Sequence, residues 1–381
     1  MQRSTERILT THTGSLPRPD ALEQAMFAVM DGKPQDAEGL QSLVREATLD
    51  VVRRQSSCGV DILNDGEFGK PSYSTYVTDR LTGFGGESGP MNIQDFSEYP
   101  GAEEALLTDP GFTHLVRPAC IGPVERRADA DAATANDIAL LKEGLGGVEV
   151  TEAFMTAVSP ATITMFLENQ YYPDDESYLY ALAEAMAPEY KAIVDAGLVL
   201  QVDCPDLGCG HVMYPGASAD ELKRKLPVHV EALNHALGDL PPDRMRMHVC
   251  WGNYDGPHHR DIELREIVDT VLRARPDGLV LEGANPRHEH EWRVFQDVPL
   301  PDGKVLMPGV IDSTNNYIEH PELVAQRLVR YADVVGKENV VAASDCGFGT
   351  LVGMRGTAPS VAWAKLETMA KGAELATREL W

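Results

Sequence analysis

The 381-residue sequence predicts a (β/α)₈ barrel. Short apolar runs alternate with longer amphipathic segments, and this alternation indicates parallel strands with helices outside them. Polar residues follow nearly every apolar run, as expected of a barrel whose active site collects at the carboxyl ends of its strands. No glycine-rich phosphate-binding motif follows a strand, which argues against the rival fold, an open doubly wound sheet.

Nine apolar runs have the length and composition of strands. They are Ile8–Thr11, Val60–Asn64, Val116–Ile121, Val148–Thr156, Leu198–Val202, Met245–Val249, Gly278–Leu281, Val305–Ile311 and Val340–Ala343. Only eight can belong to the barrel. The weakest is Val116–Ile121, because it follows the Pro/Gly-rich segment Thr82–Phe112. We therefore assign the region near residues 82–147 to an insertion beside the barrel.

Segments with a period near 3.6 residues lie between most of these runs and predict the outer helices. They are Leu40–Cys58, Asp175–Ala196, Ala219–Leu237, Ile262–Ala274, Pro321–Val335 and Val361–Glu379. No low-complexity linker or internal repeat divides the chain, so we predict one domain over residues 1–381.

The net charge of the chain limits the classes of molecule that it is expected to bind. It has 59 Asp and Glu against 33 Lys and Arg, a formal charge of −26 that disfavours nucleic acid and anionic membranes. No stretch approaches the roughly 20 apolar residues of a membrane span, and the N-terminus lacks the apolar core of a signal peptide. We expect a cytoplasmic protein with small-molecule partners and with cysteines that are free or metal-bound. A homo-oligomer is compatible with the sequence.

Four residues after different predicted strands have the chemistry of metal ligands. His248 and Cys250 are two positions apart, so a strand presents both on one face. Glu282 follows a buried run, where an unpaired carboxylate is costly to desolvate. Cys346 precedes a glycine after the last run. One imidazole, two thiolates and one carboxylate suit Zn²⁺ better than Mg²⁺ or Ca²⁺.

This ligand set predicts activation of a thiol. A free thiol is only a few per cent thiolate at neutral pH, and the thiolate is the nucleophile. Coordination to zinc deprotonates a thiol. Exchange of a weakly held Glu282 would admit the substrate sulfur. We therefore expect a zinc-dependent thiol alkyltransferase whose partners are a small-molecule thiol and an alkyl donor.

These motifs resemble the catalytic barrel of the cobalamin-independent methionine synthase family. That family has a His-x-Cys, a later Glu and an Asp-Cys-Gly, as in His248-Val-Cys250, Glu282 and Asp345-Cys346-Gly347 here. The matching motifs run from the segment 10–15 to Cys346. The resemblance implies a barrel of the methionine synthase/uroporphyrinogen decarboxylase-like type with catalytic zinc, methyl transfer and a role in methionine biosynthesis.

The resemblance also implies contacts to homocysteine. Gly14 and Ser15 would contact it through backbone and hydroxyl groups, and the acidic pair Glu67 and Asp203 would receive its amino group.

The chain departs from the family on the methyl-donor side. Phe166 stands where the family presents a tryptophan to folate, and the family's Arg-Cys pair is missing around Arg117. Thr314 occupies the position of the proton-donating histidine, which leaves the proton donor unassigned. His12, His211 and His320 are candidates to replace it, and each also fits a structural role. Folate as the methyl donor is therefore in question, and a methylated corrinoid or a small methyl compound is the alternative.

The closer resemblance is to single-barrel relatives of methionine synthase II type, which share Cys250-Trp-Gly-Asn253 and Asn285-Pro-Arg-His-Glu-His290. That group includes epoxyalkane:coenzyme M transferases, whose sulfonate substrate requires a cationic pocket. Candidate anion contacts for it are Arg18, Arg117 and Arg287. Glu67 and Asp203 instead favour an amino-acid thiol. The alternative of another class is a binding barrel with structural zinc; ligands drawn from three distant strands disfavour it.

Overall fold

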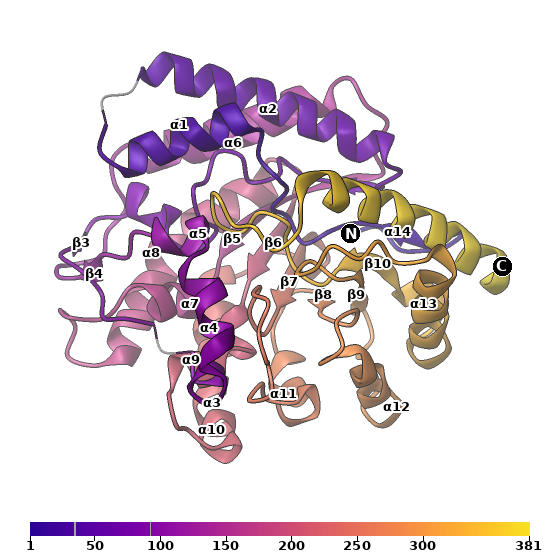
Figure 1. Ribbon diagram of the computed structural model, residues 1–381. Helices are drawn as coiled ribbons and strands as arrows, with labels where there is room; N and C mark the ends of the chain where they lie inside the picture. The colour runs from indigo at the N-terminus through magenta and orange to yellow at the C-terminus, as the bar shows by residue number, and fades with distance from the viewer. Residues whose placement is uncertain (34–35, 92) are drawn as a thin grey trace.

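The predicted strands form a nearly closed barrel of eight parallel strands (Figure 1). The computed structural model describes residues 1–33, 36–91 and 93–381. The strands neighbour one another in the order β1-β10-β9-β8-β7-β6-β5-β2. They are β1 (Leu9–Thr10), β2 (Ile62–Leu63), β5 (Glu152–Val158), β6 (Val199–Asp203), β7 (Met245–Val249), β8 (Gly278–Leu281), β9 (Val305–Ile311) and β10 (Val341–Ser344).

The two end strands, β1 and β2, come together through the residue that precedes β2. The backbone N–H of Asp61 donates to the carbonyl of Thr10 at 3.1 Å. The N–H of Thr10 donates in turn to the Asp61 carboxylate at 2.9 Å. These bonds bring the ends of the sheet together, so the strand ends surround one central site.

The barrel interior has an apolar layer and, nearer the carboxyl ends of the strands, a polar layer. Phe154, Val199 and Val280 pack together in the apolar layer. Above them, the buried guanidinium of Arg246 lies 3.4 Å from the centre of the Phe154 ring and donates to the side chain of Gln201 at 2.7 Å. An arginine on the inner face of β7 therefore supports polar side chains at the carboxyl ends of the strands.

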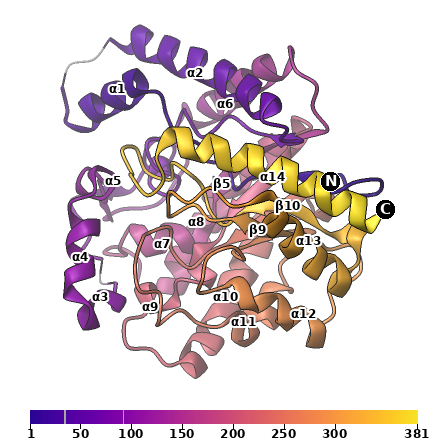
Figure 2. The same ribbon diagram turned by 45° about the vertical axis from the view of Figure 1, so that its right-hand side comes forward.

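Helices surround the barrel. The longer ones are α1 (Asp20–Met30), α2 (Ala37–Ser57), α6 (Ala130–Leu145), α7 (Pro160–Phe166), α8 (Asp175–Asp195), α10 (Ala219–Leu237), α11 (Leu264–Val271), α13 (Pro321–Val335) and α14 (Pro359–Leu380). In α10, Ser218 and Glu221 form a capping box, which satisfies free N–H groups at the helix start. Helices α1, α2 and α6 lie together on one side, and α13 packs beside α14 (Figure 2).

The remaining short elements lie in the loops. They are η1 (Tyr76–Asp79), η2 (Pro205–Leu207), α9 (Gly210–Met213), η3 (Pro242–Arg244), η4 (Glu289–Arg293), α12 (Val294–Asp297) and η5 (Lys337–Asn339). Among the described residues, no helix combines the length and the apolar character that a membrane crossing needs.

The predicted insertion near 82–147 contains two different parts. Residues 82–129, here called the excursion, carry short elements on one side of the barrel (Figure 2). The rest of the range is mainly α6, which contacts α2 and α8 as part of the outer helix layer. The run Val116–Ile121 contributes only β4, outside the barrel as expected. The elements of the excursion are β3 (Phe84–Gly85), α3 (Asp95–Glu98), α4 (Pro100–Leu107), α5 (Pro110–Thr113) and β4 (Ala119–Cys120).

Candidate metal centre and substrate cavity

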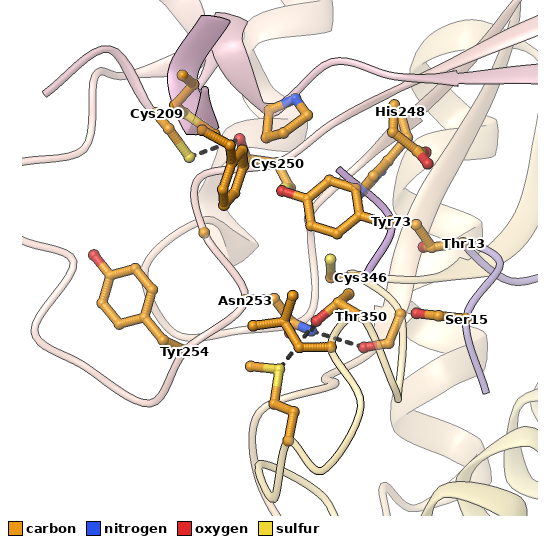
Figure 3. A pocket seen from close by; sticks show the side chains of 18 of the residues that line it. Thr13, Ser15, Tyr73, Cys209, His248, Cys250, Asn253, Tyr254, Cys346 and Thr350 are labelled. Carbon is orange, nitrogen blue, oxygen red and sulfur yellow. Dashed lines mark hydrogen bonds between the residues drawn. The ribbon is translucent and has the colours of Figure 1, made fainter. Parts of the chain in front are cut away.

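Three of the four predicted metal ligands meet at the carboxyl end of the barrel. His248 lies near the end of β7, Cys250 follows that strand, and Cys346 follows β10. One ligand atom of each lies within 4.8 Å of the other two, and all three side chains are buried (Figure 3). Both ring nitrogens of His248 are buried without a hydrogen-bond partner. Unpartnered buried polar atoms are uncommon in native proteins, so this imidazole is suited to a ligand that the site would hold.

The two sulfurs differ in ionisation. The hydrogen bond with the Cys346 thiol lowers the pKa of Cys250 well below its usual value, and the charge of His248 acts in the same direction. Burial lowers the pKa of His248, but Cys250, Asp203 and Glu282 together outweigh it and raise that pKa. The neighbouring Cys250 and burial raise the pKa of Cys346 well above its usual value, so Cys250 is the more readily ionised of the two sulfurs.

Glu282, the fourth predicted ligand, lies outside this three-residue group. Its Oε1 accepts a hydrogen bond from the Trp251 N–H and its Oε2 accepts one from Asn285, each at 2.7 Å. Asp345 accepts a second bond from the same Asn285 side chain at 2.9 Å. Burial, partly offset by His288, raises the pKa of Glu282 to about 8. The loop after β8 thus holds this carboxylate through donors on both of its oxygens.

The predicted acidic pair lies together in the barrel mouth. Glu67 and Asp203 are both buried, and Oε2 of Glu67 has no hydrogen-bond partner. Burial and the charge of Glu67 raise the pKa of Asp203 to about 7. One Asp203 oxygen accepts from Gln201 at 2.7 Å, and Gln201 is in turn held by Arg246. Two adjacent carboxylates, one of them with a free oxygen, are suited to bind a cation such as an ammonium group.

Gly14 forms the tight backbone next to this pair. Its φ is +139°, and a Cβ there would lie 2.6 Å from a Thr156 methyl and 2.7 Å from the Glu67 carboxylate. Glu67 itself has a φ of +61°, a left-handed conformation that is rare for a residue with a side chain. Such strain concentrates at functional sites. Ser15 is buried and lines the adjoining cavity.

A cavity connects the acidic pair with the sulfurs and encloses about 820 Å³ outside the protein atoms, part of it open to solvent (Figure 3). Its polar end carries Ser15, Glu67, Asp203 and the metal-ligand group. Much of the remaining wall is apolar, and part of it comes from the excursion. The apolar wall residues are Met91, Ile93, Phe112, Met165, Phe166, Val212, Leu351 and Met354.

The residues predicted to contact the methyl donor or an anion do not lie in one place. Phe166 lines this cavity and also a second cavity, which contains Arg117. Arg287 lines neither; its guanidinium lies 3.4 Å from the carbonyl of Asp261. Thr314 lines neither of these two cavities. Its hydroxyl and its backbone N–H both donate to the Asp312 carboxylate at 2.8 Å.

Sequence reasoning gave no specific role to three residues that line the cavity, although Asn253 belongs to the shared motif Cys250–Asn253. Tyr73 is buried there, and burial together with the nearby sulfurs raises the pKa of its phenol well above the usual value, so the phenol keeps its proton. Cys209 is a buried free thiol, and its Sγ contacts the carbonyl of Cys250 at 3.7 Å (Figure 3). Asn253 donates to the carbonyl of Gly347 at 2.8 Å. All three lie in loops, where strand periodicity gives no signal.

Known proteins resemble the chain over nearly its whole length. Methionine synthase of Thermococcus kodakarensis is 26% identical over 372 residues, which cover 97% of this chain and 94% of that protein. Methionine synthase of Sulfurisphaera tokodaii is 27% identical over 373 residues, with 97% and 93% covered. No family model matches the sequence.

A solved structure shares the fold. The B12-independent methionine synthase from Shewanella sp. W3-18-1, determined in complex with selenomethionine, superposes with a TM-score of 0.74 at 20% identity. The match covers 98% of this chain and 99% of that one. The (β/α)₈ barrel and the resemblance to methionine synthases are thereby confirmed, and these relatives have the length of a single barrel.

Proposed function

We propose that this chain is a zinc-dependent homocysteine methyltransferase that forms methionine. The observation that carries the proposal is the convergence of His248, Cys250 and Cys346 in the same cavity as Glu67 and Asp203. The metal-ligand group suits the sulfur of an amino-acid thiol, and the two carboxylates suit its ammonium group. The methionine synthases among the relatives, which are matched over almost their whole length, support the same assignment.

The ligand group would hold Zn²⁺ through one imidazole and two thiolates. The unpartnered nitrogens of His248 and the sulfur pair support this fit. Glu282 lies beside the group and is the proposed fourth ligand, which must leave at least one of its hydrogen bonds to reach the metal. Bound zinc would supply Lewis acidity that keeps the substrate sulfur deprotonated at neutral pH.

The chain's own residues would orient the amino acid. Its ammonium group would bind between Glu67 and Asp203, where a free carboxylate oxygen is already buried. Gln201 holds one oxygen of Asp203, so the pair is ordered before substrate binds. The protonated Tyr73 phenol, close to the sulfurs, would donate a hydrogen bond near the reacting centre.

The apolar wall would exclude water from the methyl transfer. We propose that the donor reaches the sulfur past Phe166, because this residue borders both cavities. Arg117 in the second cavity would then contact an anionic part of the donor.

Coenzyme M is the less suitable thiol. Its sulfonate needs a cationic contact, and none of the described residues that line the first cavity is an arginine or a lysine. The two carboxylates there would repel it.

The test is turnover of purified, zinc-loaded protein with homocysteine and three donors in separate arms: a methylated corrinoid, an N5-methyl folate and a small methylsulfonium. Methionine formation in any arm, lost in Cys346→Ser and retained in Cys120→Ser, is the expected result. Cys120 is the matched control, since it is a buried free thiol outside the ligand group. Turnover of an epoxide with coenzyme M and none with homocysteine would overturn the proposal.

A further inference from the structure

A second cluster of metal-ligating side chains lies outside the thiol site. Asp95 begins α3 in the excursion, His211 lies in α9, and Asp261 lies in the loop between β7 and α11. One ligand atom of each lies within 4.8 Å of the other two, and all three are buried. We propose that these three side chains bind a divalent metal ion that fastens the excursion to the barrel loops.

His211 carries the argument, because its ring has no hydrogen-bond partner although it is only 6% exposed. Its Nδ1 lies 3.8 Å from Oδ1 of Asp261, and its Nε2 lies 3.9 Å from Oδ2 of Asp95. Both separations exceed the range of a hydrogen bond.

Asp261 is oriented as metal-ligating carboxylates commonly are. Its Oδ2 accepts hydrogen bonds from His258 at 2.8 Å and from His288 at 3.1 Å. Its Oδ1, the atom that faces His211, has no partner. One oxygen is therefore anchored while the other is free, the arrangement in which neighbouring groups orient a metal ligand.

Asp95 is fully buried and is held by neutral donors. The Tyr254 hydroxyl donates to its Oδ2 at 3.0 Å, and the Arg260 backbone N–H donates to its Oδ1 at 3.1 Å. His259 lies 3.4 Å from Oδ1 without forming a hydrogen bond. A buried carboxylate without a bonded cation is costly, and a metal ion would neutralise it.

The donor set indicates the class of ion. Ligand atoms about 2.1 Å from one ion stand about 3.0–4.2 Å apart. An ion can bind only one nitrogen of the His211 ring, and the 3.8 Å between Nδ1 and Oδ1 of Asp261 falls within this range. One ligand atom of each of the three residues lies within 4.8 Å of the other two, so a small shift of Asp95 would complete the set. One imidazole and two carboxylates suit Zn²⁺, Mn²⁺ or Fe²⁺, whereas soft ions prefer thiolates. The second site shares no ligand with the thiol site, so the two can be emptied separately.

The position of the cluster gives the ion a structural role. Tyr254, which donates to Asp95, lines the substrate cavity, as do Met91 and Ile93 just before Asp95 (Figure 3 shows Tyr254). An ion bound here would hold this wall of the cavity against the loops after β6 and β7.

The test uses Co²⁺ on the full chain carrying Cys250→Ala and Cys346→Ala, which removes the thiol site. After loading and dialysis we expect about one Co²⁺ per chain by elemental analysis, without the sulfur-to-cobalt charge-transfer absorption of the wild type. Adding His211→Gln should remove this cobalt. Adding His229→Gln should leave it, since His229 is equally buried but bonded at both nitrogens, to Asp206 and Tyr214.

Binding of no cobalt by the folded double alanine variant would overturn the proposal. So would full retention of cobalt in folded His211→Gln and in Asp261→Asn. A second readout is limited proteolysis, in which chelation of the double alanine variant should expose cleavage sites within residues 93–113. An unchanged cleavage pattern would contradict the fastening role.

Discussion

The backbone N–H of Trp251 donates a hydrogen bond of 2.7 Å to Oε1 of Glu282. This bond ties the carboxylate after β8 to the residue that follows Cys250, so the predicted fourth ligand is held beside the sulfur pair. Because Asn285 binds the other oxygen, the carboxylate would give up at least one hydrogen bond on moving to a metal. Glu282 is therefore suited to weak, exchangeable coordination.

Removal of Glu282 should weaken zinc binding without abolishing it. In Glu282→Ala we expect zinc affinity to fall by at least the roughly 10–100-fold that loss of a group supporting the ligands costs, with some binding kept because three ligands remain. Competition with a chromophoric chelator measures the change. Glu289→Gln is the control, since that side chain pairs with Arg327 on the far side of the loop. Equal zinc affinity in wild type and Glu282→Ala would contradict the assignment.

Tyr73 should contribute to turnover and not to metal binding. Tyr73→Phe keeps the ring that packs edge-to-face on Phe166 and removes only the hydroxyl near the sulfurs. Loss of a hydrogen bond to a charged group costs about 1.5–3 kcal/mol, so we expect kcat/KM to fall about 10–100-fold. Zinc content should not change. A loss of zinc, or activity equal to wild type, would count against this role.

Gly14 should be intolerant of any side chain. In Gly14→Ala the added Cβ would lie 2.7 Å from Glu67 Oε1, which displaces the carboxylate proposed to bind the amino group. We expect KM for homocysteine to rise about tenfold or more, equivalent to about 1.4 kcal/mol. The matched control is Gly32→Ala, because Gly32 also has a positive φ, +67°, but nothing lies within 4 Å of an added Cβ. Similar KM values in the two variants would contradict the model of the pocket.

His12 should make the fold sensitive to acid. Its Nε2–H donates to the side-chain oxygen of Gln55 at 2.8 Å, and its Nδ1 accepts from the Gly14 N–H at 3.2 Å, which requires a neutral ring. Burial lowers its pKa from 6.5 to about 4. The unfolded chain therefore binds this proton more tightly, and stability is lost as the pH falls from 6.5 to 4.

The size of that loss can be measured by comparing variants. The shift corresponds to a loss of up to about 3 kcal/mol in the free energy of unfolding. Urea unfolding of wild type and His12→Gln at pH 7 and pH 4.5 isolates this contribution, since the carboxylates are common to both. We expect the variant to lose less stability on acidification. An identical loss in both proteins would refute the assignment.

Much of the barrel, and the meeting of His248, Cys250 and Cys346, could be predicted from the two-residue period of strands and from parallel pairing. His248 lies on β7 and Cys250 directly after it, and parallel strands bring Cys346 to the same end of the barrel. The end of the insertion was harder to predict, because no clear change in composition separates it from α6 (Ala130–Leu145).

The rest depends on contacts between distant loops. The bonds that hold Glu282 come from Trp251 and Asn285, and sequence spacing does not report whether a carboxylate is already engaged. Arg287 is one candidate for an anion contact, and its guanidinium lies near the backbone carbonyls of His259 and Asp261. Tyr73 lies in a loop after β2, and it approaches the cysteine sulfurs only because the loops at the carboxyl end of the barrel pack together.

The most direct test of the central claim is zinc K-edge absorption of the purified protein before and after homocysteine is added. We expect the resting site to show two sulfur ligands together with nitrogen and oxygen, and the homocysteine complex to show three sulfurs. Coenzyme M at the same concentration should leave the spectrum unchanged. A protein that binds no zinc, or whose sulfur coordination stays the same with homocysteine, would contradict the proposed thiol activation.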